Sequence, residues 1–388
     1  MKSNWPTKKL SDLLDTCDAG VWGKPAIKGK GLFVLRSTNM TNDGHLNFSD
    51  VAERKVEGDI KKVKLLNGDI LVEKSGGGPD QPVGRVAYFV APDGQPYSFA
   101  NFIQRLRVKS DLIDSRFLFY RLLFLHKIGF TKKLQSQTTG IRNLKLSLYL
   151  KTEIPTPPLN IQKQIVERLD KIAKAQKLND DLIQKADELY RSLLYNELNT
   201  KFKNQNAKSQ FKIKKLGEVA DYINGRAFKP TEWSSSGLPI IRIQNLTETQ
   251  EKFNYFNGKV EDKYLVKDGD ILLSWSASLG VYVWNKGDAV LNQHIFKVVP
   301  HSDINKDYLF HALVTAVEEL KRRVHGSTMT HVTKPVFNRV TIGVPPLETQ
   351  KQIVAKLSAA QEYKIQLLGQ KSKLKELFDS VLAKSFRQ

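Results

Sequence analysis

A ten-residue string that occurs twice constrains the fold of this chain more than any other feature. Residues 157–166 read PPLNIQKQIV, and residues 345–354 read PPLETQKQIV, 188 positions later. Repeats with periods of roughly 20–50 residues indicate solenoids. A period near half of a 388-residue chain instead indicates duplicated domains, each large enough to form its own core. The sequence therefore predicts two similar globular units, here called the first and the second repeat.

The distance between matching positions shrinks along the two repeats. Lys9 matches Lys215 at 206 positions and Gly68 matches Gly269 at 201, whereas the doubled string is 188 positions apart. The first repeat is thus longer by 206 − 188 = 18 residues, most of them after the Gly-Asp pair that predicts a turn before a short strand. The segments that follow this strand, residues 75–85 and 274–280, differ in sequence. A shared frame with different loops is typical of a scaffold that recognises two different ligands.

The composition is strongly basic. Lys and Arg total 61 against 40 Asp and Glu, which gives a formal net charge of +21 and a pI near 9.7. This balance indicates a polyanionic partner, although a charged solvated surface and an anionic membrane surface are alternatives. No apolar run approaches the ~20 residues of a spanning helix, and the N-terminus lacks the apolar region of a signal peptide. We expect a soluble, cytoplasmic protein.

The order of the expected elements predicts an α+β fold with two similar mixed α/β domains. A long, glycine-poor segment with helical periodicity follows each copy of the string, and a helix of ~40 residues is about 60 Å long. Apolar residues at heptad-like spacing predict that these two helices pack against each other, antiparallel, rather than each on its own domain. The predicted segments are domain 1 at 1–158, helix 1 at 159–200, a polar linker at 201–210, domain 2 at 211–346 and helix 2 at 347–388.

Motifs of catalysis are missing from the sequence. Residues 23–31 come nearest to a phosphate-binding loop, but their spacing is wrong and no Ser or Thr follows the lysine. We find no GxGxxG after a strand, no HExxH, no methyltransferase-type Asn/Asp-Pro-Pro-Tyr/Phe and no zinc-ligand spacing. The single cysteine, Cys17, is expected to be a packed side chain. The sequence favours a binding module without a metal or cofactor of its own over an enzyme whose active site is unrecognised.

Three features carry a resemblance to a known family: the doubled apolar-Pro-x-Pro-Pro element with its Gln-Lys-Gln-Ile-Val sequence, a Lys-Leu pair near the start of each repeat, and Gly-Asp-Ile-Leu in the middle of each domain. In these features the chain resembles the specificity (S) subunit of type I restriction-modification systems. The resemblance covers essentially the whole chain; the second repeat departs from it slightly, with Ile342-Gly343-Val344 before its Pro-Pro pair. It implies a non-catalytic subunit whose two target-recognition domains, in a pseudo-twofold arrangement, each read half of a bipartite target in double-stranded DNA.

The same resemblance implies partners. The two helices would set the spacer between the half-sites and bind two adenine-N6 methyltransferase (modification) subunits, which restriction (translocase-nuclease) subunits can join. S-adenosylmethionine and ATP would be bound by these partner subunits. The alternative within this class is the specificity partner of a related system, in which one chain fuses methylation and cleavage.

Base reading needs donors and acceptors on loops that enter a groove, so we predict DNA contacts from the polar loops at equivalent places in the two repeats. Ordinary polar loops, and packing in the case of Trp275, are the alternatives. In the first repeat the candidates are Ser75, Gly77, Gln81, Arg85, Thr138, Thr139 and Arg142. In the second they are Trp275, Ser276, Ser278, Arg322, Ser327, Thr328, Thr330 and His331. The predicted subunit-interaction residues on the helices are Gln162, Gln164, Ile165, Leu169, Gln350, Gln352, Ile353 and Leu357.

Overall fold

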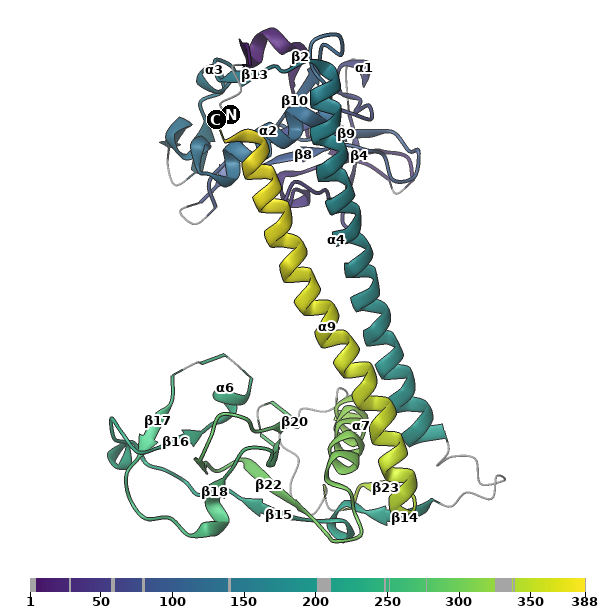
Figure 1. The fold of residues 1–388 in the computed structure, drawn as a ribbon, viewed down its shortest axis with the longest axis vertical. Helices are drawn as coiled ribbons and strands as arrows, with labels where there is room; N and C mark the ends of the chain where they lie inside the picture. The colour runs from purple at the N-terminus through teal and green to yellow at the C-terminus, as the bar shows by residue number, and fades with distance from the viewer. Residues whose placement is uncertain are drawn as a thin grey trace. The chain divides into compact units, whose positions relative to one another are not determined.

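The computed structural model divides into two compact units (Figure 1). It describes residues 5–387 except 28, 57–59, 79–80, 139–140, 201–210, 248, 251, 277, 325–336 and 338. Unit 1 consists of Met1–Asn179 and Gln370–Gln388, and unit 2 of Asp180–Gly369. Each unit therefore contains the domain of one repeat, the first part of the long helix that follows it, and the end of the long helix of the other repeat.

Unit 1 is built from short strands with helices beside them. Its strands form sheets in the orders β2-β10-β6-β8, β3-β5-β4-β9, β11-β12-β7 and β1-β13. The strands are β1 (Thr7–Lys9), β2 (Leu14–Ala19), β3 (Lys24–Pro25), β4 (Leu32–Leu35), β5 (Ala52–Lys55), β6 (Ile70–Glu73), β7 (Ser75–Gly77), β8 (Val86–Tyr88), β9 (Tyr97–Phe99), β10 (Ile103–Val108), β11 (Gln135–Thr138), β12 (Ile141–Leu144) and β13 (Glu153–Pro155). The helices are α1 (Ile60–Val63), α2 (Ser115–Lys127), α3 (Leu146–Tyr149) and the start of α4 (Leu159–Leu194).

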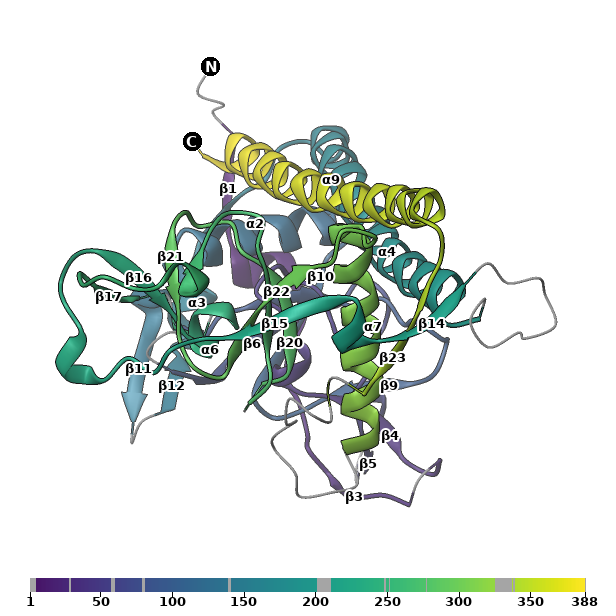
Figure 2. The same ribbon diagram turned by 90° about the horizontal axis from the view of Figure 1, so that it is seen from below.

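Unit 2 repeats this plan. Its sheets have the orders β15-β22-β19-β20, β17-β16-β21-β18 and β14-β23, and α7 lies beside the first of them (Figure 2). The strands are β14 (Lys212–Lys215), β15 (Ala220–Asn224), β16 (Leu238–Ile241), β17 (Asn254–Phe256), β18 (Leu265–Val266), β19 (Ile271–Ser274), β20 (Gly280–Val283), β21 (Ala289–Leu291), β22 (Ile295–Pro300) and β23 (Thr341–Val344). The helices are α6 (Ile243–Leu246), α7 (Lys306–Val324) and the start of α9 (Leu347–Phe386).

The two units share their main sheets, so the duplication visible in the sequence is a duplication of the fold; the sheet β11-β12-β7 of unit 1 has no counterpart among the described strands of unit 2. The order β2-β10-β6-β8 corresponds to β15-β22-β19-β20, and each second sheet has one parallel pair, β4 with β9 and β16 with β21. β6 and β19 lie inside their sheets and are buried along their whole length, which explains their apolar sequences. The predicted fold class, two similar mixed α/β domains with two long antiparallel helices, is confirmed.

The long helices end inside a hydrophobic core of the unit opposite to the one where they begin. In unit 1, Ile165 and Leu169 of α4 share a core with Phe378, Leu382 and Phe386 of α9. In unit 2, the corresponding core contains Ile353 and Leu357 of α9 together with residues of α4 and of the π-helical turn Tyr195–Thr200 that follows it: Tyr190, Leu193, Leu194 and Leu198. The predicted packing of the two helices on each other is confirmed, and each helix packs in addition on its own domain, which was expected only as the alternative.

Within each unit, polar contacts also join the two long helices or the turn that follows α4. In unit 1 the amide of Gln176 donates to the carbonyl oxygen of Leu374 at 3.3 Å. In unit 2 Lys364 is paired with Asp187 at 2.5 Å, and Lys356 with Glu197 at 2.9 Å. The polar residues of the seam therefore find partners on the facing helix.

Candidate nucleic-acid interface

The structure joins the two predicted DNA-contacting loops of the first repeat in one small sheet. Ser75 and Gly77 lie in β7, and β12 pairs with it so that Arg142 is opposite Gly77. Thr138 ends β11, which pairs with β12 so that Thr138 is opposite Ile141. No local pattern connects these segments, because they lie far apart along the chain.

The candidates of this sheet differ in accessibility. Gln81 is exposed, Ser75 and Arg142 are partly exposed and Gly77 is buried. A Cβ at Gly77 would lie 2.6 Å from the carbonyl oxygen of Gln81, so only glycine fits where this loop folds back on the strand. The backbone of Thr138 is described but its side chain is not, and Thr139 lies outside the described residues.

Arg85 was expected to face DNA, but the structure places it inside unit 1. The guanidinium group pairs with the buried carboxylate of Glu73 at 2.7 Å, and it also donates to the carbonyl oxygens of Met40 (2.6 Å) and Ser37 (3.0 Å). Arg85 is 8% exposed. A guanidinium group with these internal contacts holds the loop onto β6, so we remove Arg85 from the candidate base readers.

The equivalent loop of the second repeat is a tight turn beside an aromatic cluster. The Ser274 hydroxyl donates to the carbonyl oxygen of Ser278, whose own N–H donates to the carbonyl oxygen of Ser276. The indole of Trp275 is partly exposed, and its ring stacks on Phe296 with centroids 5.7 Å apart. Ser276 is buried and Ser278 partly exposed.

The remaining candidates of the second repeat fall where the structure gives little or no description. Arg322 lies in α7, but its side chain is not described. Ser327, Thr328, Thr330 and His331 lie outside the described residues. These positions remain predictions from the sequence.

The first glutamine of the doubled string holds each long helix to its own domain. The side-chain oxygen of Gln162 accepts from the backbone N–H of Asp114, the N-cap of α2, at 2.8 Å, and its amide donates to the carbonyl oxygen of Pro157 at 2.7 Å. Gln350 makes the equivalent bonds to Asn305 (2.7 Å) and Pro345 (2.9 Å), and its amide also donates to the carbonyl oxygen of Asp303 at 3.2 Å. We call each arrangement a glutamine latch; both side chains are almost fully buried.

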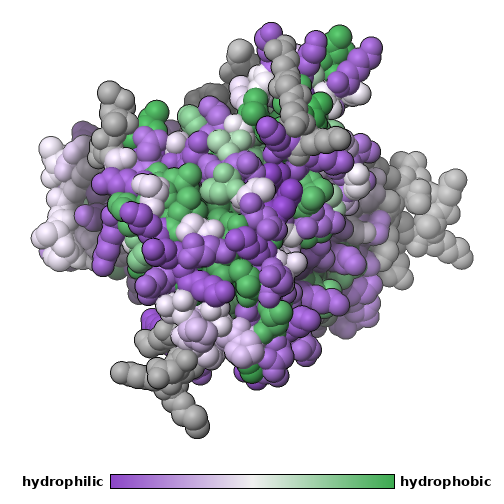
Figure 3. All heavy atoms as spheres, turned by 90° about the horizontal axis from the view of Figure 1, so that it is seen from above, coloured by the Kyte–Doolittle hydropathy of each residue, from purple (hydrophilic) through white to green (hydrophobic). Residues whose placement is uncertain are grey.

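Six of the eight predicted subunit-interaction residues are therefore internal. The two glutamine latches and the buried side chains of Ile165, Leu169, Ile353 and Leu357 belong to the cores of the units and are not presented to a partner. Gln164 and Gln352 are exposed. The apolar side chains exposed on the helices are others, namely Leu159, Leu178 and Leu377 in unit 1 and Leu189, Leu347, Tyr363, Ile365 and Leu368 in unit 2. Figure 3 shows one face of the molecule, where exposed apolar residues interrupt a mainly hydrophilic surface.

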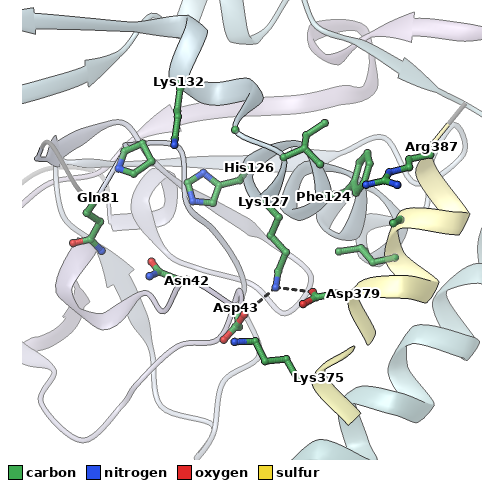
Figure 4. Close-up of a pocket in the computed structure, with 15 residues that line it drawn as sticks. Asn42, Asp43, Gln81, Phe124, His126, Lys127, Lys132, Lys375, Asp379 and Arg387 are labelled. Atoms are coloured by element: carbon green, nitrogen blue, oxygen red, sulfur yellow. Dashed lines mark hydrogen bonds and ion pairs between the residues drawn. The ribbon is translucent and has the colours of Figure 1, made fainter. Parts of the chain in front are cut away.

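A basic cleft of about 690 Å³ in unit 1 was not predicted (Figure 4). Lys127 of α2 lies between two carboxylates, Asp43 at 3.0 Å and Asp379 at 2.9 Å, and fixes the end of α9 to the domain. Burial opposes its charge, but the two carboxylates raise the pKa of Lys127 above its ordinary value. Lys132 and Lys375 add positive charge to the walls. Residues 127 and 379 are 252 positions apart, so no local sequence signal could have identified this cleft.

Neither a membrane-spanning helix nor a metal site is found in the described parts of the chain. No described helix combines the length and the apolar composition needed to cross a bilayer. No cluster of three or more described His, Cys, Asp or Glu side chains could hold a metal ion.

Comparisons with known proteins point to one family over most of the chain. A family model described as "Type I restriction modification DNA specificity domain" matches residues 2–188 and 208–376. The specificity subunit of the type I restriction enzyme MjaVIII from Methanocaldococcus jannaschii is 24% identical over 389 residues, which cover 92% of this chain and 86% of that protein. The EcoBI specificity subunit of Escherichia coli is 27% identical over 178 residues, 45% of this chain and 36% of the relative.

Solved structures share the fold. The S subunit of a type I restriction-modification system from M. genitalium has a TM-score of 0.59 at 17% identity, with 99% of this chain and 96% of that chain covered. A chain from a study of complex assembly and conformational transition of the type I system has a TM-score of 0.64, also at 17% identity, with 100% and 98% covered.

Proposed function

Because this chain belongs to the family of the type I restriction-modification DNA specificity domain, we propose that it is the non-catalytic subunit that reads a bipartite target in double-stranded DNA. The domain of the first repeat (1–158) reads one half-site and that of the second (211–346) the other. The helices at 159–200 and 347–388 set the spacer, and residues 201–210 link the halves. The observation that carries this proposal is one backbone frame, present twice, with different loops after β6 and β19.

Charge supports duplex DNA as the ligand. The chain has a formal net charge of +21, and basic side chains that neutralise phosphates give a protein affinity for DNA without sequence preference. Polar loops at the ends of a rigid frame then supply the base contacts. We place the subunit in the cytoplasm, with the DNA.

Partner subunits complete the function. Two methyltransferase subunits, which restriction subunits can join, would bind the faces of the helices where Leu178, Leu189 and Ile365 are exposed by 60%, 51% and 66%. Apolar side chains exposed at this level on a long helix favour a docking surface. Ile165, Leu169, Ile353 and Leu357, buried in the cores, do not contribute to it.

Base-resolution mapping of N6-methyladenine, after co-expression with the cognate methyltransferase, tests this function. The expected result is a split motif with a fixed gap. Replacement of residues 1–158 by the first domain of another family member should change one half of the motif only. A contiguous motif, a change in both halves, or methylation by this chain without other subunits would contradict the proposal.

The spacer can be tested on the helices alone. Deletion of residues 178–184 and 366–372, which are 188 positions apart, removes one heptad from each helix and keeps the apolar seam in register. Seven helical residues span about 10 Å, so the gap between the methylated half-sites should become shorter. An unchanged gap in an assembled complex would show that the helices do not set it.

A further inference from the structure

Two residues occupy equivalent backbone positions beside the divergent loop in each unit. In unit 1 the N–H of Lys74, directly after β6, donates to the carbonyl oxygen of Phe102, directly before β10, at 2.9 Å. In unit 2 the N–H of Trp275, directly after β19, donates to the carbonyl oxygen of His294, directly before β22, at 3.2 Å. The strand ladders on either side correspond as well. We call each pair a loop-entry pair.

The backbone of the two loop-entry pairs is the same, but their chemistry is not. Unit 1 has an ammonium group and a phenyl ring, and the ring of Phe102 is 41% exposed. Unit 2 has an indole and an imidazole, whose rings meet edge to face with centroids 4.9 Å apart. The two units thus place different hydrogen-bond donors and apolar groups at equivalent backbone positions. Such positions are suited to distinguish two ligands.

The ring of Phe102 lies beside the first residues of the loop. A Cβ at Gly76, whose φ is +106°, would lie 3.5 Å from the Phe102 ring, so the ring packs on the first residues of the loop. The phenyl group therefore has the loop on one side, while Phe102 remains 41% exposed. A side chain that already packs on its surroundings loses less entropy when it contacts a ligand.

His294 adopts a costly backbone conformation. Its φ is 71°, and it is the only non-glycine residue with positive φ among the described residues. For a non-glycine residue this conformation costs about 1–3 kcal/mol. Its Nδ1 is buried without a hydrogen-bond partner in the described structure. Glycine would adopt this backbone conformation without strain. Because His294 occupies the position in spite of the conformational cost, its imidazole is expected to have a role other than in the folding of unit 2.

We infer that the loop-entry pairs, Lys74 with Phe102 and Trp275 with His294, determine the base preference of the first and the second half-site. This inference rests on the proposed function, that each unit reads duplex DNA. In the first half-site the phenyl ring would contact an apolar base edge such as the thymine methyl group, and the ammonium group would donate to base acceptors. In the second, the imidazole would bond to a base edge with the indole packed beside it.

Four variants of the full chain, each co-expressed with the cognate methyltransferase, test the inference by motif mapping. Phe102→Ala and Lys74→Gln should relax the preference about tenfold at positions of one half-site and leave the other unchanged. Trp275→Phe and His294→Gly should do the same to the other half-site. Val90→Ala and Val283→Ala, which truncate side chains exposed by 51% and 47%, are the matched controls and should keep both half-sites.

His294→Gly separates recognition from folding. Glycine relieves the positive φ, so the unfolding midpoint should stay the same or rise while the base preference changes. An unchanged motif in all four folded variants would overturn the inference, as would a uniform loss of affinity without a change in base preference, which would indicate phosphate contacts alone. Failure of the proposed function is distinguishable, because the unmodified chain would then give no split motif.

Discussion

Gln162 and Gln350 make the same hydrogen bonds to equivalent backbone groups, whereas the loop-entry pairs, built on an equally similar frame, have no side chain in common. The comparison separates two demands on a duplicated chain. The join between domain and helix must be the same twice if both units are to hold their helices alike. The loops must differ if the two units are to bind different ligands. Identity and divergence therefore occur at different places in the same fold.

The two units are expected to differ most in how strongly each holds the end of the long helix that belongs to the other repeat. Phe386 of α9 packs on Phe117 and Phe124, with centroids 5.3 and 6.1 Å apart, and its carbonyl oxygen accepts from Arg121. Leu198, 188 positions earlier, fills the equivalent place in unit 2 with a smaller side chain. Phe386→Ala should lower the free energy of unfolding by about 3–5 kcal/mol and Leu198→Ala by about 2–3 kcal/mol.

Urea denaturation of the two variants measures this difference. Leu377→Ala, on the same helix as Phe386 but 48% exposed, is the control and should change the free energy of unfolding by less than about 0.5 kcal/mol. Equal losses for Phe386→Ala and Leu198→Ala would show that the two ends are held equally strongly in spite of their different packing.

The glutamine latches should respond alike. Gln162→Ala and Gln350→Ala each leave a backbone N–H of a helix N-terminus without its partner, which costs about 1–3 kcal/mol when the group is buried. Denaturant unfolding of both variants should give losses within this range and close to each other. Gln164→Ala and Gln352→Ala, two positions along and exposed, serve as controls. A loss in one latch only would break the equivalence of the two joins.

The sequence predicted the features that depend on local pattern. The doubled string indicated the duplication, and heptad spacing indicated the long helices, because both signals lie within a few turns of chain. The role of the glutamines was missed since their partners, such as the N–H of Asp114, lie 48 positions away. A glutamine in a polar string is expected at the surface, and only the fold shows that it is buried.

Arg85 illustrates the same limit at the candidate site. A polar, glycine-rich loop predicts exposure, but the carboxylate of Glu73 at the end of β6 draws the guanidinium inward. Burial of a charge is favoured only with an opposite charge and further hydrogen bonds, and neither can be read from the loop itself. Gln81 in the same loop is exposed as its sequence suggests.

The smallest expected difference between the units is in how the stability of the packed helix end depends on pH, through a histidine present at this place in unit 2. In unit 2 His311 meets Tyr190 of α4, with Nδ1 3.0 Å from the hydroxyl oxygen, whereas in unit 1 the corresponding contact joins Tyr120 and Phe378, two groups that stay neutral at ordinary pH. Burial lowers the pKa of His311 to about 4, against an opposing effect of Asp307. The unfolded chain binds a proton near pH 6.5, so between pH 6.5 and 4 it binds more protons than the folded chain, and stability falls as the pH falls through this window.

The His311→Gln variant measures this contribution, because its amide can still bond to Tyr190 but does not titrate. Between about pH 7 and 5 the unmodified chain should lose up to about 2 kcal/mol more stability than the variant, measured as hydrogen exchange of the α7 amides. His126 of unit 1, whose pKa burial also lowers to about 4, is unchanged in both proteins and cancels in the difference. If the two proteins show the same pH dependence, folding does not lower the pKa of His311, and the two helix ends differ in packing but not in the pH dependence of their stability.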